Sequence, residues 1–206
     1  MKKLAWLLLL IASQAAAAAE IPATAWRYQH TLTAIAQREF GLPAPAALLA
    51  AQVHQESSWR ADARSPYAGG LAQFTPDTIA WLSRTYKDIP PDAAFNPDAA
   101  LAALARYNRH IYDRQALPAH TECDRWAFVL SGYNGGPGWI DRDRRLCTAS
   151  GQCDNTRWFG HVEYHSERAE WAMQENRHYP RRILGELHAR YLGAGWRGTE
   201  VCTWPG

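Results

Sequence analysis

The chain has 206 residues, of which 47% are hydrophobic and 20% charged, with 14 Gly and 12 Pro. This composition is typical of a globular protein and excludes a disordered or fibrous chain. Lys and Arg number 22 against 20 Asp and Glu, so the formal net charge is only +2. Because proteins that bind nucleic acid carry a cationic excess to neutralise phosphates, we expect no nucleic acid as a partner.

The N-terminal segment has the pattern of a secretory signal peptide. Met1-Lys2-Lys3 is basic, residues 4–12 are apolar and residues 15–19 are all alanine. The apolar run is shorter than the roughly 20 residues that span a bilayer, and small residues suit a cleavage site. We therefore expect a signal peptide over residues 1–19, one domain over residues 20–206, and an exported protein in the periplasm or outside the cell.

Four cysteines remain after the predicted signal: Cys123, Cys147, Cys153 and Cys202. An even number of cysteines in an exported chain favours disulfides, and none of the spacings is the CxxC of a zinc site. The pairs Cys147–Cys153 and Cys123–Cys202 would close a short loop and tie a helix start to the C-terminal segment. They represent one of three pairings that the sequence allows.

Several segments carry the signals of a helix start. Three segments have proline at or near the first turn of a predicted helix, and they begin at Pro45, Thr75-Pro76 and Asn96-Pro97. Proline is tolerated there because an N–H in the first turn has no partner within the helix. The first of these segments runs through Glu56. Thr121, followed three residues later by Asp124, resembles a capping box that opens a further helix.

Apolar side chains then recur at helical spacing in three stretches. They are Leu101, Leu104, Ala105, Ile111 and Tyr112; Trp126, Ala127, Leu130 and Tyr133; and Ile183, Leu184, Leu187 and Tyr191. Strand signals are scarce. Residues 140–160 show little periodicity, which predicts a long loop. We expect a mainly α-helical fold in a single domain.

One carboxylate falls on the apolar face of the first predicted helix. Ala46, Leu49 and Val53 form an apolar stripe, and Glu56 takes its next position. Burial and the partial negative charge of a helix C-terminus both disfavour the ionised form, so the pKa of Glu56 should rise. A carboxylic acid that stays protonated near neutral pH suits a general acid. The alternative is a helix that ends one residue earlier and leaves Glu56 turned to solvent.

Three sequence blocks follow in order. The first contains Glu56-Ser57-Ser58-Trp59, Ser65-Pro66, Gly70-Leu71-Ala72-Gln73 and Pro76; the second is Gly132–Gly138; the third is Glu175–Leu184. Together, over about residues 45–192, they resemble the soluble lytic transglycosylases and goose-type lysozymes, glycoside hydrolase family 23. Ala72 replaces the usual Met and Gly135 replaces an Ala, which bears on substrate preference more than on the chemistry.

The resemblance implies a lysozyme-like helical fold that cleaves the β-1,4 bond between N-acetylmuramic acid and N-acetylglucosamine in peptidoglycan. Glycoside hydrolysis normally divides the work between two carboxylates, and the blocks offer one obvious carboxylate, Glu56. In the family the N-acetyl group of the muramic acid is thought to stabilise the cationic centre, and the 6-hydroxyl of the same sugar attacks. The resemblance thus implies that Glu56 acts first as acid and then as base and leaves a 1,6-anhydromuramoyl end. It implies no cofactor.

The same resemblance assigns substrate-binding roles to five further residues. Ser65 would bind near the N-acetyl group or the neighbouring sugar, and Gln73 would shape the site beside the acid. Tyr179 would form a hydrogen bond near the acid and orient it. Tyr133 and Asn134 lie where their helix runs into two glycines, which stop a helix and let backbone approach a ligand.

These residues also have purely structural interpretations. Ser65-Pro66 would then be only a turn, Tyr133 a core ring and Tyr179 a cap on the last helix. We interpret Glu175 as a structural hydrogen-bonding partner rather than a second catalytic group. Trp59 and Trp139 adjoin motifs and are candidates for stacking on sugar faces.

One short segment contains a candidate set of metal ligands. His161, Glu163 and His165 alternate and would point to one side of an extended segment. Because no further cluster completes a zinc motif, we expect a partly solvated surface patch and no metal.

Two other functions stay open at this point. A true lysozyme on the same fold would use water as the nucleophile and a second carboxylate, for which Asp62 and Asp77 are the nearby candidates. A non-catalytic module would only bind the wall, although such a module has no need of a general acid. The expected partner is the peptidoglycan glycan strand, with secretion, conjugation or phage-lysis machinery as candidate partners, and we expect a monomer.

Overall fold

The computed structural model describes residues 20–203, and helices form nearly all of the regular structure there. The α-helices are α1 (Gln29–Phe40), α2 (Ala46–Ser57), α3 (Pro76–Thr85), α4 (Pro97–Arg114), α5 (Glu122–Gly135), α6 (Gly138–Ala149), α7 (Glu170–Arg182) and α8 (His188–Gly193). Shorter turns are the 3₁₀ segments η1 (Ala23–Tyr28), η2 (Ala93–Phe95) and η3 (Val162–Tyr164), and the π turn η4 (Ile183–Leu187). Extended pairing among the described residues is limited to two isolated bridges between residues 64 and 74. The predicted mainly α-helical fold is confirmed.

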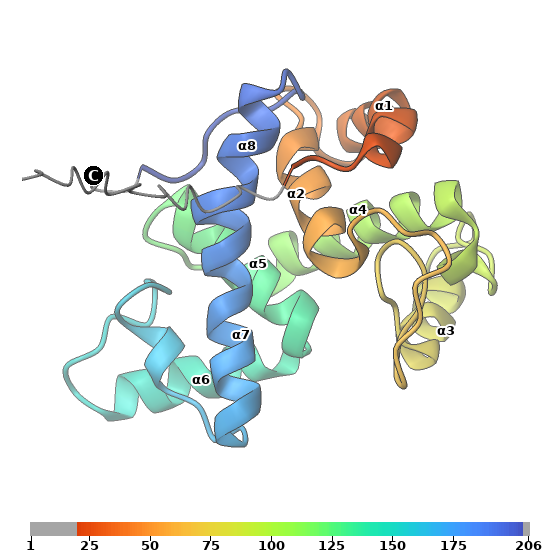
Figure 1. Ribbon diagram of the computed structural model, residues 1–206. Coiled ribbons are helices and arrows are strands. Elements are labelled where there is room, and N and C mark those ends of the chain that lie inside the picture. Colours follow the sequence, from red (N-terminus) through yellow and green to blue (C-terminus); the bar gives the residue numbers. More distant parts are fainter. Residues whose placement is uncertain (1–19, 204–206) are drawn as a thin grey trace, which may run out of the picture.

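A long helical rod runs through the middle of the molecule (Figure 1). It consists of α7, η4 and α8, which follow one another without a break. On this rod α5 packs against α7, while α2 packs against η4 and α8; α4 packs against both α1 and α5. The arrangement brings the end of α2, which carries Glu56, next to Tyr179 on the rod.

The predicted helix starts are confirmed, and side chains cap three of them. α2 begins at Ala46, directly after Pro45. The side chains of Thr75, Asn96 and Thr121 each accept a hydrogen bond from a backbone N–H in the first turn of α3, α4 and α5, over 3.2, 3.2 and 3.0 Å. A side-chain acceptor at this position satisfies a donor that has no partner within the helix.

The prediction of a long loop over residues 140–160 is wrong in its first half, which forms α6. The buried face of this helix contains Ile140, Arg144 and Cys147, so a charged residue interrupts the apolar stripe and hides the periodicity. Arg144 is tolerated there because its guanidinium donates to the carbonyl oxygens of four successive residues, 115 to 118, at 2.7–3.3 Å. Beyond α6, turns continue to residue 160.

Two disulfides link distant and neighbouring parts of the fold. Cys123 at the start of α5 is bonded to Cys202 beyond α8, and Cys147 in α6 is bonded to Cys153. The favoured pairing of the three is therefore confirmed. None of the helices in residues 20–203 combines the length and apolarity needed to cross a bilayer. The predicted signal, residues 1–19, lies outside the described residues.

Candidate active site

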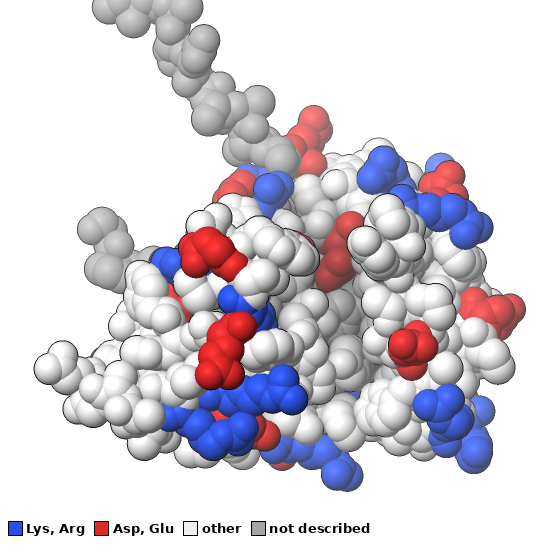
Figure 2. Space-filling model, turned by 90° about the horizontal axis from the view of Figure 1, so that it is seen from below, with Lys and Arg blue, Asp and Glu red and all other residues white. Residues whose placement is uncertain are grey.

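A cleft of about 720 Å³ opens on the face of the molecule shown in Figure 2. Its walls come from the end of α2, the loop between α2 and α3, the end of α5, the start of α6 and the first turns of α7. All six predicted site residues line it: Glu56, Ser65, Gln73, Tyr133, Asn134 and Tyr179. Segments more than 120 residues apart in the chain thus contribute to one site.

Glu56 lies in the last turn of α2, which ends at Ser57. The alternative in which the helix stops before Glu56 is therefore wrong. The hydroxyl of Ser57 donates to the carbonyl oxygen of Leu71 over 2.8 Å, and the chain then turns through left-handed backbone at Ser58 and Trp59, with φ of 50° and 62°. This sharp turn ends α2 and leaves the Glu56 carboxyl at the cleft.

The pKa of Glu56 is raised from 4.5 to about 8, as the sequence predicted. Burial is the main cause, because a low-dielectric environment disfavours the charged carboxylate. A hydrogen bond from Tyr179 opposes the shift, and the nearby carboxylate of Glu175 adds to it. Near neutral pH Glu56 is therefore neutral in most molecules and carries a proton that it can donate.

A directed chain of buried hydrogen bonds leads to Glu56 from the core. Asn108 on α4 donates to the side-chain oxygen of Gln52 over 2.7 Å, and the Gln52 amide donates to the Tyr179 hydroxyl over 3.3 Å. Tyr179 donates in turn to Oε1 of Glu56. Because a phenol has one hydrogen, accepting from Gln52 commits that hydrogen to Glu56. The burial of Tyr179 raises the pKa of its phenol well above the usual range, and the nearby Glu56 raises it further. The phenol therefore stays protonated.

Gln52 and Asn108 were missed by the sequence analysis, although each is fully buried. Gln52 interrupts the apolar run of α2, and Asn108 lies on the same face of α4 as Leu104 and Ile111. A buried amide on an apolar helix face needs a partner, and this is the sequence signal that could have identified them.

Tyr133 fixes the loop between α2 and α3 against the end of α5. Its hydroxyl donates to the carbonyl oxygen of Ala72 over 2.8 Å, and its ring lies 5.6 Å from that of Phe74. Burial and the nearby Glu56 raise the pKa of Tyr133 well above its usual range. The structural and the substrate-binding interpretations of Tyr133 are therefore compatible, since it packs against the core and also lines the cleft.

Gln73 and Gly70 shape the same loop. Gln73 has left-handed backbone, with φ of 45°, and its side-chain nitrogen donates to the carbonyl oxygens of Gly70 and Ala63 over 2.9 and 3.3 Å. At Gly70 a Cβ would lie 1.6 Å from the carbonyl oxygen of Ala94, so glycine is required there. The amide of Gln73 thus braces the loop while the residue lines the cleft.

Ser65 and Asn134 also line the cleft, from the loop between α2 and α3 and from the end of α5. The Ser65 hydroxyl accepts from the backbone N–H of Ala68 over 2.9 Å and holds a tight turn at the cleft. Asn134 accepts from the amide of Asn176 over 3.0 Å. Because this bond fixes its oxygen, the amide nitrogen of Asn134, which has no acceptor among residues 20–203, is left as a donor for a ligand.

Two expectations about neighbouring aromatic and acidic residues are wrong. Trp59 is only 1% exposed and packs against Tyr28, Tyr191 and Trp196 in the core, so it forms no part of the cleft. Trp139 does line the cleft. Glu175 also lines it and is exposed, and within the described part of the chain its carboxylate has no hydrogen-bond partner, so it is not a structural partner. Trp171, which no motif indicates, is 72% exposed and also lines the cleft.

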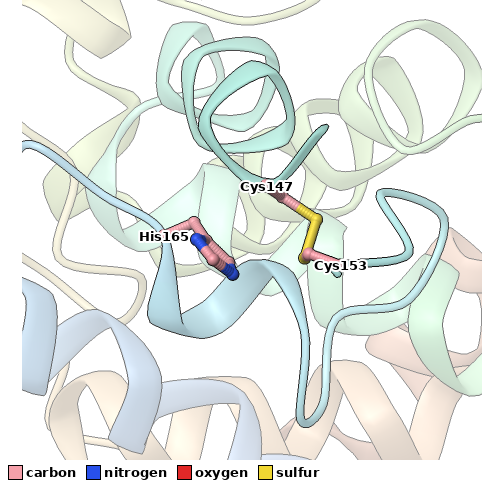
Figure 3. A group of neighbouring side chains, drawn as sticks. All are labelled: Cys147, Cys153 and His165. Atoms are coloured by element: carbon pink, nitrogen blue, oxygen red, sulfur yellow. A yellow bond between two sulfur atoms is a disulfide. The ribbon is translucent and has the colours of Figure 1, made fainter. Parts of the chain in front are cut away.

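The three predicted metal-ligand candidates do not converge. The carboxylate of Glu163 accepts from Arg181 over 2.5 Å and from the backbone of Gly160, and His161 accepts from the backbone of Asp154 over 3.0 Å. His165 instead lies next to Cys147 and Cys153, whose side chains are joined in a disulfide (Figure 3). Sulfurs bonded to each other are not the thiolates that bind metals.

Comparison with known proteins supports the family resemblance seen in the sequence motifs. Residues 31–152, more than half of the chain, match the family model described as the transglycosylase SLT domain. Of the six predicted site residues, only Tyr179 falls outside this range.

Similar curated proteins carry related names. The chain is 32% identical to a membrane-bound lytic murein transglycosylase F of Marinobacter nauticus over 120 residues, or 57% of this chain and 22% of that protein. It is 33% identical to a protein of the same name from Maricaulis maris over 132 residues, or 64% of this chain and 26% of that protein. The matched regions therefore span about a quarter of the length of these relatives. With the match to the family model covering the helices that carry Glu56, Tyr133 and Asn134, the chain belongs to the transglycosylase SLT domain family.

Proposed function

We propose that this protein is an exported lytic transglycosylase that cleaves the β-1,4 bond between N-acetylmuramic acid and N-acetylglucosamine in peptidoglycan. The observation that carries the proposal is a neutral Glu56 in a cleft, held by a buried tyrosine. A protonated carboxyl in this position can donate to the oxygen of the leaving sugar.

Tyr179 gives the two oxygens of Glu56 different tasks. Since Oε1 accepts the hydrogen bond of Tyr179, the acidic proton is carried by Oε2. After donation, the carboxylate that remains is stabilised by the same phenol, because a hydrogen bond to the charged form favours it. Glu56 can then take the proton of the 6-hydroxyl as that oxygen attacks, and the sugar closes to the 1,6-anhydro form. The pKa of about 8 lies close enough to neutral pH for both steps.

The walls of the cleft suit a glycan. Trp139 and the exposed Trp171 are in its lining, and flat rings of this kind stack on sugar faces. The amide nitrogen of Asn134 offers a hydrogen-bond donor in the same cleft. The names of the relatives, which refer to murein, agree with peptidoglycan as the substrate.

Hydrolysis is the competing reaction, because a lysozyme would position water with a second carboxylate. Asp62 and Asp77, the candidates for that role, are exposed and do not line the cleft. Glu175 is the other carboxylate in the lining. No hydrogen bond among the described residues holds Glu175 in place to orient water, which favours the transglycosylase.

Export is supported by two features of the chain. Residues 1–19 have the pattern of a secretory signal. The described part of the chain contains two disulfides, which persist in oxidising compartments such as the periplasm or the cell exterior.

The mass of the products tests the proposed reaction. Purified peptidoglycan is digested with the protein, and the released fragments are analysed by mass spectrometry. We expect muropeptides that end in 1,6-anhydromuramic acid. Fragments heavier by one water would assign the protein to hydrolysis and would direct attention to Glu175.

A further inference from the structure

Arg168 is a charged residue of the cleft to which the proposed function assigns no task. It directly precedes Ala169, the N-cap of α7, and its side chain lines the cleft together with Gly135 and Trp139. Only 6% of that side chain is exposed. A guanidinium this deeply buried needs partners for its five N–H donors.

The hydrogen bonds of Arg168 use only one nitrogen of the guanidinium. Nη1 donates to Oδ2 of Asp143 over 2.7 Å and to the hydroxyl of Ser166 over 3.3 Å. Nε and Nη2 are buried, and neither has a hydrogen-bond partner among residues 20–203. Unpaired buried donors are costly and uncommon in native proteins, so a site with two of them points to a missing ligand.

The two unpaired nitrogens form one edge of the guanidinium, and this edge lies against Gly135 in the wall of the cleft. A Cβ on Gly135 would lie 2.8 Å from Nδ2 of Asn176, 3.2 Å from Nη2 of Arg168 and 3.4 Å from its Nε. A methyl group at this position would press on that edge. Glycine adds no side chain against that edge, and both Gly135 and Arg168 line the cleft.

The remaining neighbours hold the guanidinium in place. Asp143 is 1% exposed and fixes the opposite edge, and the guanidinium carbon lies 4.8 Å from the ring centroid of Trp139. A planar group fixed in this way offers two parallel N–H donors, the arrangement that binds a carboxylate with two hydrogen bonds.

We propose that Arg168 binds a carboxylate of the glycan substrate through Nε and Nη2. The inference rests on the proposed function and adds a preference for strands that carry an acidic group. Two parts of peptidoglycan supply such a group. One is the lactyl carboxylate of a muramic acid that has lost its peptide, and the other is a carboxylate within a stem peptide.

The test measures binding to the full chain with Glu56→Gln, which holds substrate without cleaving it. Three probes of equal glycan length are titrated by calorimetry: a chitooligosaccharide without a carboxylate, a peptide-free peptidoglycan strand and a peptide-bearing strand. Adding Arg168→Gln should weaken binding of one acidic strand by about 10- to 100-fold, the value of a charged hydrogen bond. Binding of the chitooligosaccharide should not change. The acidic strand whose binding is weakened identifies the source of the carboxylate.

Two further variants separate recognition from folding, because Arg168→Gln leaves Asp143 buried without its partner. Combining Arg168→Gln with Asp143→Asn removes both charges and should give the same selective loss. The matched control is Arg142→Gln, since Arg142 also lies over Trp139, at 4.9 Å, but is exposed and outside the cleft lining. It should bind all three probes normally.

Equal weakening of all three probes, or no weakening of either acidic strand, would overturn the inference. Failure of every probe to bind while Arg168 is intact would instead contradict the proposed function, and the inference with it.

Discussion

The ionisation of Glu56 is set mainly by its burial and adjusted by two neighbouring side chains. Burial raises its pKa, the Tyr179 hydroxyl lowers it and the Glu175 carboxylate raises it again, with a result of about 8. The residue is therefore held near the point at which it can both give and take a proton close to neutral pH.

Removing the Tyr179 hydroxyl should change the pH dependence of cleavage. In Tyr179→Phe the bond that favours the Glu56 carboxylate is lost, so the pKa of Glu56 rises and the alkaline limb, near pH 8 in the wild type, moves to higher pH. The rate at the optimum should fall roughly 10-fold or more, since the acid is less well oriented.

The matched control for this pH profile is Tyr191→Phe. Tyr191 is also buried and hydrogen-bonded, to Trp59 over 2.6 Å, but it does not line the cleft. It should lower the melting temperature without moving the alkaline limb. A Tyr179→Phe profile that matches the wild type would contradict the orienting role.

The same raised pKa predicts how stability depends on pH. The folded protein holds the Glu56 proton more tightly than the unfolded chain, so its stabilising contribution is complete below pH 4.5 and is lost as the pH rises towards 8. Glu56→Gln has no such loss. Its free energy of unfolding relative to wild type should therefore increase over this range, by up to a few kcal/mol. Denaturant titrations at several pH values measure it, and a difference that is independent of pH would refute a raised pKa.

The sequence indicates some of these residues better than others. Glu56 is recognisable because it follows an apolar stripe and heads a motif. Arg168 and Gln52 are not recognisable in this way, because their importance depends on contacts with residues distant in the chain. Arg168 contacts Asp143, and Gln52 contacts Tyr179. Trp59 shows the opposite error, because adjacency to Glu56 in sequence does not place its ring on the same side of a sharp turn.

At the scale of helices, local signals predict starts well. The helices capped by Thr75, Asn96 and Thr121 all begin where expected, because the signals of a helix start depend on only a few adjacent residues. The helix α6 was missed because Arg144 takes a core position, and only the carbonyl groups of residues 115–118, contributed by another segment, make that burial acceptable.

The cap of α4 offers a quantitative test at this scale. Asn96→Ala removes the acceptor for the Ala99 N–H and should lower the free energy of unfolding by ~1 kcal/mol, with normal cleavage. Asn96→Asp keeps an acceptor and should remain near wild type. Equal losses in both variants would show that the cap is not what Asn96 contributes.

At the scale of the whole molecule, the two disulfides constrain the chain to different extents. Cys123–Cys202 joins residues 79 apart, whereas Cys147–Cys153 joins residues six apart. Because a longer closed loop restricts the unfolded chain more, replacing the first pair by alanine should cost roughly 4 kcal/mol and the second roughly 2 kcal/mol. Denaturant titration of the two double variants measures this order, and a larger loss for the short loop would contradict it.

The central claim, that Glu56 donates the proton that breaks the glycan, is tested most directly by one comparison. Peptidoglycan is digested in parallel with the wild type and Glu56→Gln, soluble anhydromuropeptides are quantified by mass spectrometry, and binding to insoluble peptidoglycan is measured on the same samples. Glutamine keeps the size of the side chain but has no acidic proton. We predict that the variant binds the polymer as the wild type does and releases no anhydromuropeptides. Release by the variant at the rate of the wild type would contradict the account.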